Sequence, residues 1–241
     1  MGAAMFQELV EGLDNLRTRT ARFRRVALHL HSPDSHDWGT GGDATKNDEM
    51  RFRAANGIEE FVGELRPHLD FVCVTDHMRC GFGAQVSEHT VGPEEFIVLP
   101  GMEVNIRAEA ALGLARIHLL VVLPEGSTPE HFERLFAGLE GIPAKDDQRT
   151  GQEEITGLGL AEWVRRVHGE NGICIAAHVE SQQGVRWLFR QTARETLELF
   201  DEDAKEAAEK EVGGSVKEYL FESGLDGVEV RSVKDVPHYR W

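Results

Sequence analysis

The sequence predicts an α/β domain built around a parallel β-sheet. Short, continuously apolar segments alternate with stretches of helical periodicity along the chain, which is the pattern of strands buried on both faces by helices. The 241 residues, 41% of them hydrophobic, are enough for one full core. We find no internal repeat and no linker. We therefore expect a single domain over residues 1–241, with residues 1–24 as an N-terminal helical extension.

Six apolar segments are expected to form the strands. They are residues 26–31, 69–75, 96–106, 117–123, 173–177 and 227–230. Helices are expected between them. Asn56 and Glu59 resemble a capping pair that opens a helix through Leu65. Further helices are expected over residues 128–139, where proline occupies the first turn, and over residues 160–168 and 215–224. The intervening stretches 39–50, 79–93 and 145–157 are expected to be loops that line the pocket.

Ionisable side chains occur near the ends of five successive strands. The first strand ends on His29 and His31, and alternation along a strand places both imidazoles on one face. The next four strands carry Asp76 and His77, then Glu103, His118 and His178. One histidine on an apolar strand is usually a satisfied core residue, but five coincidences are hard to accept. Reactive groups gather at the strand ends of parallel barrels, and imidazole with carboxylate is a ligand set for zinc, manganese or iron. We therefore expect two or three cations bridged by Glu103.

The order of these motifs, HxH, TDH, PGxE, a strand histidine and AH, resembles the polymerase and histidinol phosphatase (PHP) family of metal-dependent phosphoesterases. The resemblance runs from His29 to about Val230. It implies a distorted (β/α)7 TIM-like barrel with up to three metals at the carboxyl ends of the strands. It also implies three sets of ligands: His29, His31 and Glu103 for the first metal, His118, His178 and Glu103 for the second, and Asp37 and His77 for the third.

Three residues close to the motifs need separate comment, because they depart from the family pattern or are not part of it. Asp37 stands eight residues after His29, where family members often have histidine. His36 lies one residue out of register and is expected to be a loop histidine. Asp76 is expected to orient His77 without binding a metal itself.

The late Asp-x-His motif of PHP proteins, typically within "SDAH", does not occur in this sequence. Asp235 and His238 have the wrong spacing to replace it. The simplest account is a chain that ends before the final strand. In that respect it resembles the N-terminal PHP portion of longer TrlF-type proteins, in which an SMC-like or AAA-like ATPase follows. Metals one and three would then each be short of a ligand.

These residues predict a metal-dependent phosphoesterase, a phosphatase or nuclease, which hydrolyses a phosphate ester of a nucleotide or nucleic-acid end with a metal-activated water. Arg79 and Arg107 are candidates to hold a phosphate oxygen, although surface salt bridges are the favoured interpretation. Two alternatives stay open. One is a catalytically silent PHP module that regulates or docks an ATPase. The other is an amidohydrolase-type metal hydrolase, which usually needs a bridging lysine, and no lysine occurs between Lys46 and Lys145.

Composition restricts the partners. The formal charge of −16, concentrated in residues 195–211, argues against broad non-specific affinity for nucleic acid. No apolar run approaches the roughly 20 residues that span a bilayer, and no signal peptide is evident, so we expect no membrane partner and a cytoplasmic protein. Cys73, Cys80 and Cys174 are expected to be reduced core thiols.

Overall fold

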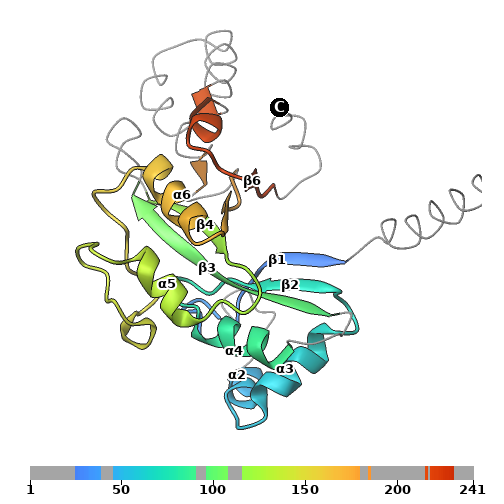
Figure 1. Cartoon of the computed structure of the whole chain (residues 1–241). Helices are drawn as coiled ribbons and strands as arrows, with labels where there is room; N and C mark the ends of the chain where they lie inside the picture. The colour runs from blue at the N-terminus through green and yellow to red at the C-terminus, as the bar shows by residue number, and fades with distance from the viewer. Residues whose placement is uncertain are drawn as a thin grey trace, which may run out of the picture.

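The computed structural model describes residues 25–38, 46–90, 96–107, 116–179, 184–185, 215–216 and 218–230. Within these ranges six strands form one sheet in the order β1-β2-β3-β4-β5-β6 (Figure 1). Their bounds are Val26–Leu30 (β1), Phe71–Val74 (β2), Ile97–Arg107 (β3), Arg116–Val122 (β4), Ile173–Ala176 (β5) and Gly227–Val228 (β6). All six lie within the segments expected to be strands, give or take a residue at the ends, and the α/β prediction is confirmed.

Five α-helices and one short 3-10 helix are described. They are α2 (Lys46–Phe52), α3 (Gly57–Leu65), α4 (Gly81–Thr90), α5 (Pro129–Leu135), η2 (Asp146–Gln148) and α6 (Leu160–Gly169). Helix α5 begins as predicted, because Thr128 forms a capping box with His131 and Pro129 follows it. Helix α3 also begins after Asn56, but that side chain donates to Glu60 rather than capping the helix backbone. Residues 215–216 and 218–222 are helical as well.

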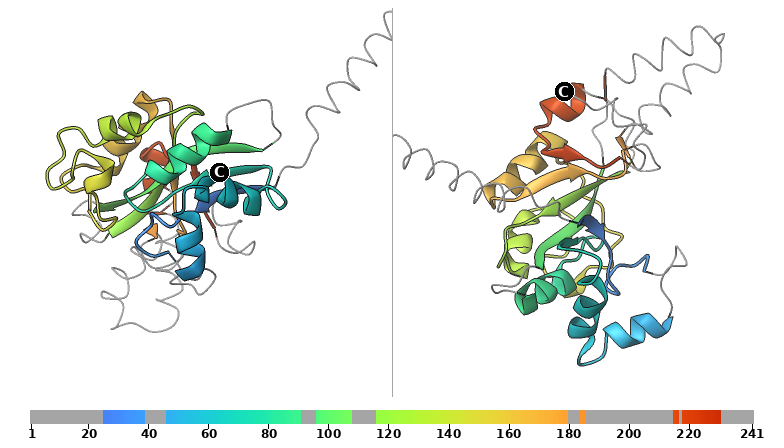
Figure 2. Two further views of the ribbon diagram at one scale, coloured as in Figure 1. Left: turned by 90° about the horizontal axis from the view of Figure 1, so that it is seen from below. Right: turned by 90° about the vertical axis from the view of Figure 1, so that its right-hand side faces the viewer.

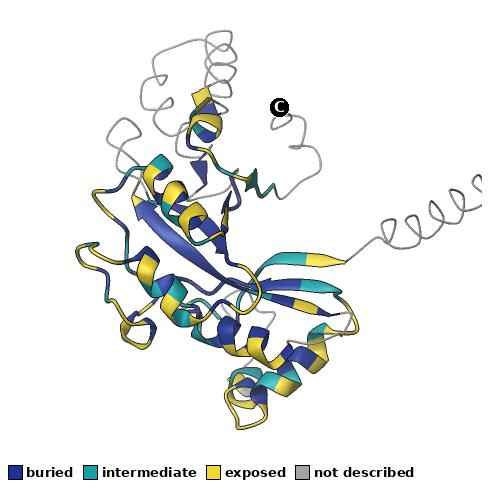
Figure 3. Cartoon of the chain, in the orientation of Figure 1, coloured by how far each residue is buried: buried dark blue, intermediate teal, exposed yellow. Residues whose placement is uncertain are grey.

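Two separate hydrophobic clusters join the helices to the sheet. Helices α2, α3 and α4 cover β1, β2 and the first part of β3 with aromatic side chains such as Phe61 and Phe82. Helices α5 and α6 cover the rest of β3 with β4 and β5, where Phe132 and Trp163 are fully buried. In Figure 3 most of β3 is correspondingly dark and the outer faces of the helices are largely exposed, whereas the edge strand β1 is teal and yellow. All three cysteines are buried and free, as expected.

The expectation of a fully parallel sheet is wrong at β4. Strands β1, β2 and β3 are parallel to one another and β5 is parallel to β6, but β4 runs antiparallel to both β3 and β5. Only residues 108–115 separate β3 from β4. That length is shorter than the dozen or more residues that a parallel crossover needs. The reversal has a consequence for the site, because it brings the start of β4, with His118, to the edge where the other strands end.

The sheet is curled into half of a barrel, and its two edge strands, β1 and β6, do not pair with each other. The sheet is twisted, as the two views of Figure 2 show. On the concave side Leu28 of β1 packs against Leu120 and Ile175 of β4 and β5. At one end the ring of His29 in β1 hydrogen-bonds with Glu229, directly after β6. A seventh strand is not among the described residues.

Strand β3 changes partner at Pro100-Gly101, and this change positions the residue that follows. Residues 97–100 pair with β2, and residues 101–107 pair with β4. Proline offers no N–H to a ladder. A Cβ atom on Gly101 would lie 2.4 Å from Cys73 Sγ and 2.8 Å from Thr75 Cγ2, so only glycine lets the two strands approach this closely. Glu103 stands two residues beyond this crossing point.

Helix α4 lies where the sequence predicted a loop, and a distant carboxylate explains the difference. Asp146 accepts hydrogen bonds from the backbone N–H groups of Cys80 (2.8 Å) and Gly81 (3.1 Å), at the start of the helix. A carboxylate there replaces the missing local cap and interacts favourably with the helix dipole. Asp146 also pairs at 3.3 Å with Arg149, whose side chain is fully buried. Arg149 in turn donates to the carbonyl oxygen of Met78, next to His77.

We therefore expect Asp146→Ala to destabilise the protein strongly. The substitution removes the cap of α4 and leaves the buried Arg149 guanidinium without its carboxylate, which typically costs about 3–5 kcal/mol. Urea unfolding of the metal-free protein measures the free energy of unfolding. Asp147→Ala, one residue along the same 3-10 helix, is the matched control. Equal stability of the two variants would contradict the expectation.

Among the residues that the structure describes, no helix combines the length and apolar character that crossing a bilayer demands.

Candidate metal centre

The centre of the site is the buried carboxylate of Glu103, whose side chain is 1% exposed. Five imidazoles contact it. Its Oε2 atom lies 2.9 Å from His29 Nε2, 3.0 Å from His31 Nε2 and 3.3 Å from His77 Nε2. Its Oε1 atom lies 2.8 Å from His118 Nδ1 and 3.3 Å from His178 Nε2. Burial opposes ionisation of Glu103, but hydrogen bonds from the imidazoles outweigh it and hold the pKa of this carboxyl well below its usual range.

His29 and His31 are held at both ring nitrogens. Each presents Nε2 to Glu103, and each donates from Nδ1 to an outer carboxylate: His29 to Glu229 at 3.0 Å and His31 to Asp37 at 2.9 Å. Burial disfavours the charged rings, but the bonded carboxylates prevail. They raise the pKa of His29 to about 9 and that of His31 to about 10. The expectation that alternation brings the two rings to one place agrees with the 3.2 Å between their Nε2 atoms.

His77 and Asp37 form the third part of the cluster. His77 Nε2 lies 3.6 Å from Asp37 Oδ2, so Asp37 stands between His77 and His31. Asp37 is half-buried, which opposes its ionisation, but hydrogen bonds from His31, His77 and Ser35 hold its pKa well below the usual range. The backbone is strained directly after His77, because Met78 has φ of 53°. Strain of this kind persists where the surroundings enforce it, often at functional sites.

The expected role of Asp76 is wrong in the structure. Its carboxylate accepts hydrogen bonds from both the backbone N–H and the hydroxyl of Ser32, each at 2.6 Å, and thereby fixes the turn after β1. Burial raises the pKa of Asp76 to about 6, although these bonds oppose the shift. His77 Nδ1 is buried without a hydrogen-bond partner among the described residues, so Asp76 does not orient that ring.

The donor set fits divalent cations better than it fits hydrogen bonding alone. A carboxylate offers about four acceptor positions, fewer than the five imidazoles that converge on Glu103. Nitrogen and oxygen ligands of this kind suit zinc, manganese or iron. Three groups have ligand atoms within 4.8 Å of one another: His29, His31 and Glu103; His31, Asp37 and His77; and His77, Glu103 and His118. The first group and the Asp37–His77 pair are those implied by the PHP resemblance.

All seven predicted ligands therefore come together, and their role in binding metal stays a prediction. His36 lies in the loop after β1, as expected, and its ring centroid is 4.7 Å from that of His77. Arg107 pairs with Glu154, and Arg79 lies 3.8 Å from Asp34. These contacts agree with the salt-bridge interpretation of both arginines. Asp235 and His238, the acidic segment 195–211 and residues 1–24 lie outside the described residues.

Sequence reasoning missed Glu229. It follows β6, is half-buried, and accepts hydrogen bonds from the His29 ring and from the backbone N–H of His178. The signal was present, because Glu229 ends the last apolar segment just as the other site residues end theirs. Glu229 does not match the Asp-x-His motif of the PHP pattern, for which Asp235 and His238 are the candidates by position.

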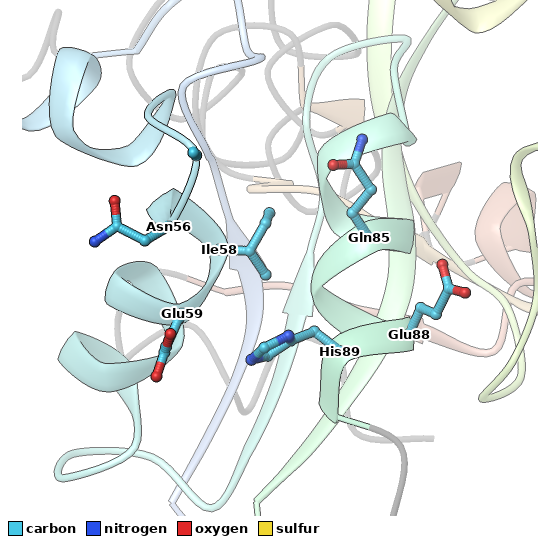
Figure 4. Close-up of a pocket in the computed structure, with 7 residues that line it drawn as sticks. Asn56, Ile58, Glu59, Gln85, Glu88 and His89 are labelled. Carbon is cyan, nitrogen blue, oxygen red and sulfur yellow. The ribbon is translucent and has the colours of Figure 1, made fainter.

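A separate groove of about 480 Å³ lies between α3 and α4 (Figure 4). It is lined by Ala55, Asn56, Ile58, Glu59, Gln85, Glu88 and His89. None of these residues belongs to the cluster around Glu103, and all but Ile58 are exposed. The groove therefore presents mainly solvated side chains and lies apart from the cluster around Glu103.

No family model matches the chain, and no curated protein matches it. Nine chains of solved structures match it, and they include the following two. One is a protein from Bifidobacterium adolescentis with a provisional assignment as a metal-dependent phosphoesterase, 16% identical over 85% of this chain and 77% of that one, with a TM-score of 0.41. The other is an amidohydrolase from Chromobacterium violaceum with bound sulfate and no metal, 13% identical over 89% and 81%, with a TM-score of 0.45. Both TM-scores are below 0.5, so these likenesses carry no information about the chemistry of the site.

Proposed function

We propose that this protein is a metal-dependent hydrolase of phosphate esters. The observation that supports it is the placement of Glu103, a buried carboxylate contacted on both oxygens by imidazoles from separate strands. A carboxylate with nitrogen ligands on either side is suited to bridge two cations. Two-metal sites are typical of phosphatases and nucleases, which clamp both the attacking and the leaving oxygen of an in-line displacement.

Seven side chains would hold two or three divalent cations: His29, His31, Asp37, His77, Glu103, His118 and His178. When bound, such cations supply a nucleophile at neutral pH and neutralise the charge that develops on the phosphate. The chain's own contribution is to keep the ligands in place. Glu103 holds five rings together, and Asp37 and Glu229 fix the far nitrogens of His31 and His29. The resemblance to PHP phosphoesterases favours a nucleotide or nucleic-acid end as the substrate, and an associated ATPase as a partner.

The amidohydrolase alternative receives less support from the site. That chemistry usually relies on a lysine that bridges two metals, whereas the central position here is occupied by Glu103. The silent-module alternative predicts the same folded cluster without turnover. Activity measurements therefore separate it from the proposal.

Two measurements test the proposal. The purified protein is expected to contain zinc, manganese or iron by elemental analysis, and to hydrolyse bis-nitrophenyl phosphate when manganese is added. His29→Ala is expected to fold but to lose metal, because His29 Nε2 faces Glu103 directly. Glu222→Ala, an exposed acidic change, serves as the control. Absence of both bound metal and hydrolysis in the unmodified protein would overturn the proposal, and metal without hydrolysis would favour the silent module.

A further inference from the structure

Glu229 connects three parts of the sheet through one oxygen atom. Its Oε2 accepts a hydrogen bond from the Nδ1–H of His29 in β1 at 3.0 Å. The same oxygen accepts the backbone N–H of His178, just after β5, at 2.7 Å. Glu229 itself directly follows β6, and its side chain is 31% exposed. It therefore ties both edges of the curled sheet to the end of β5, at the metal centre.

The contact with His29 determines which nitrogen is available for a cation. A neutral imidazole carries one proton, and the hydrogen bond made by one nitrogen decides the state of the other. Once a cation displaces the proton on Nε2, donation from Nδ1 to Glu229 keeps the remaining proton on Nδ1 and leaves the lone pair on Nε2, the atom that faces Glu103. Outer carboxylates of this kind orient histidine ligands and increase their basicity.

The contact with His178 supports an unfavourable backbone. His178 has φ of 28°, a left-handed conformation that side chains other than glycine rarely adopt. A charged acceptor for its N–H helps to hold that conformation. In it, the ring of His178 lies 3.3 Å from the Oε1 atom of Glu103. Glu229 thus supports one ligand on each side of the bridging carboxylate.

We propose that Glu229 is a positioning residue for metal binding, which fixes the Nδ1–H form of His29 and the backbone of His178. This inference rests on the proposed function of the site. It adds a role for the last strand that the motif pattern of the sequence did not indicate.

The chain contains a matched control for this role. Asp226 makes the same pair of contacts at the other end of β5: Oδ2 accepts the ring Nε2–H of His168 at 2.9 Å and the backbone N–H of Cys174 at 2.7 Å. Both carboxylates join a histidine ring to a backbone amide, Cys174 within β5 or His178 directly after it, but only Glu229 reaches residues of the metal centre. A purely structural role predicts the same consequences for both, and a positioning role does not.

The experiment compares full-length Glu229→Ala, Glu229→Gln and Asp226→Asn with the unmodified chain. Affinity for Zn²⁺ alone is measured by competition with a chromophoric chelator, and folding by circular dichroism and thermal unfolding of the metal-free proteins. Glu229→Ala is expected to weaken zinc binding about 10- to 100-fold, as for other outer-shell losses. Glu229→Gln should recover much of that loss, because its amide oxygen still accepts both hydrogen bonds. Asp226→Asn should bind zinc like the unmodified chain.

The inference is overturned if Glu229→Ala binds zinc as tightly as the unmodified chain, or if Asp226→Asn weakens binding equally. If Asp226→Asn does not fold, the two Glu229 variants decide, and equal losses in them overturn it. An unmodified chain that binds no zinc overturns this inference together with the proposed function. If the unmodified chain binds zinc without hydrolysing phosphate esters, only the proposed function fails, and the zinc affinities still decide the role of Glu229.

Discussion

Glu103→Gln is expected to reduce phosphodiester hydrolysis by about a thousandfold or more. An amide cannot bridge two cations as a carboxylate does, and losing the charge stabilisation that the metals provide is worth several kcal/mol, where each 1.36 kcal/mol is tenfold in rate. The same change removes the shared anion around which five imidazoles gather. Metal content measured by elemental analysis should therefore fall with the rate.

Glu154→Gln is the matched control for this change. Glu154 pairs with Arg107 at the far end of β3, so the substitution removes a carboxylate near the same strand without affecting the cluster. It should retain metal and activity. Circular dichroism establishes that Glu103→Gln folds. A folded Glu103→Gln protein with the metal content and rate of the unmodified chain would exclude Glu103 as the bridging ligand.

Most members of the cluster could be predicted because they follow from a local rule, whereas Asp37 was implied only by the PHP resemblance. Apolar runs that terminate in ionisable groups mark strand ends, and the carboxyl ends of parallel strands share one edge. His29, His31, His77 and His178 came from this rule alone. His118 did not fit it, because it lies near the start of its strand. It reaches the site because β4 is antiparallel, which the apolar pattern of β4 does not distinguish from a parallel strand.

The remaining features depend on contacts between residues far apart in the chain. Helix α4 begins in the sequence Gly81-Phe82-Gly83, which has low helix propensity and no local cap. Its cap is Asp146, 65 residues away from Gly81. Glu229 acts on a ring 200 residues distant. Patterns of hydrophobicity indicate which side chains of a segment are buried. They do not indicate which distant carboxylate will cap a helix or hydrogen-bond to a histidine ring.

The outer carboxylates also explain how a cation site can exist among so many basic rings. Glu103, Asp37 and Glu229 have pKa values below their usual ranges, which burial opposes and the bonded imidazoles cause. Burial lowers the pKa of His118, so that ring is neutral at pH 7. Three carboxylates thus lie beside His29 and His31, whose rings are protonated at pH 7. Anionic groups placed among the ligands in this way favour capture of a divalent cation.

Metal affinity is consequently expected to depend steeply on pH. In the metal-free protein the pKa values of His29 and His31 are about 9 and about 10, so both rings carry a proton on Nε2 at pH 7. A cation must displace those protons, while Nδ1 keeps its proton on the outer carboxylate. Each displaced proton weakens apparent binding tenfold per pH unit below the pKa. Binding at the first site should therefore weaken about a hundredfold between pH 8 and pH 7.

Raising the pH has the opposite effect on folding. It strengthens zinc binding but removes stability from the metal-free fold, so zinc affinity and the free energy of unfolding test the two pKa values independently. Because the folded pKa values of His29 and His31 lie above the ordinary histidine value of 6.5, their protonation stabilises the metal-free fold below pH 6.5. That contribution is lost as the pH rises through 9 and 10.

Zinc titrations in buffers of different ionisation enthalpy should show about two protons released per first cation at pH 7. The His31→Ala protein should release about one. Zinc affinity that is constant from pH 6.5 to 8, with no proton release, would mean that cations do not bind at His29 and His31.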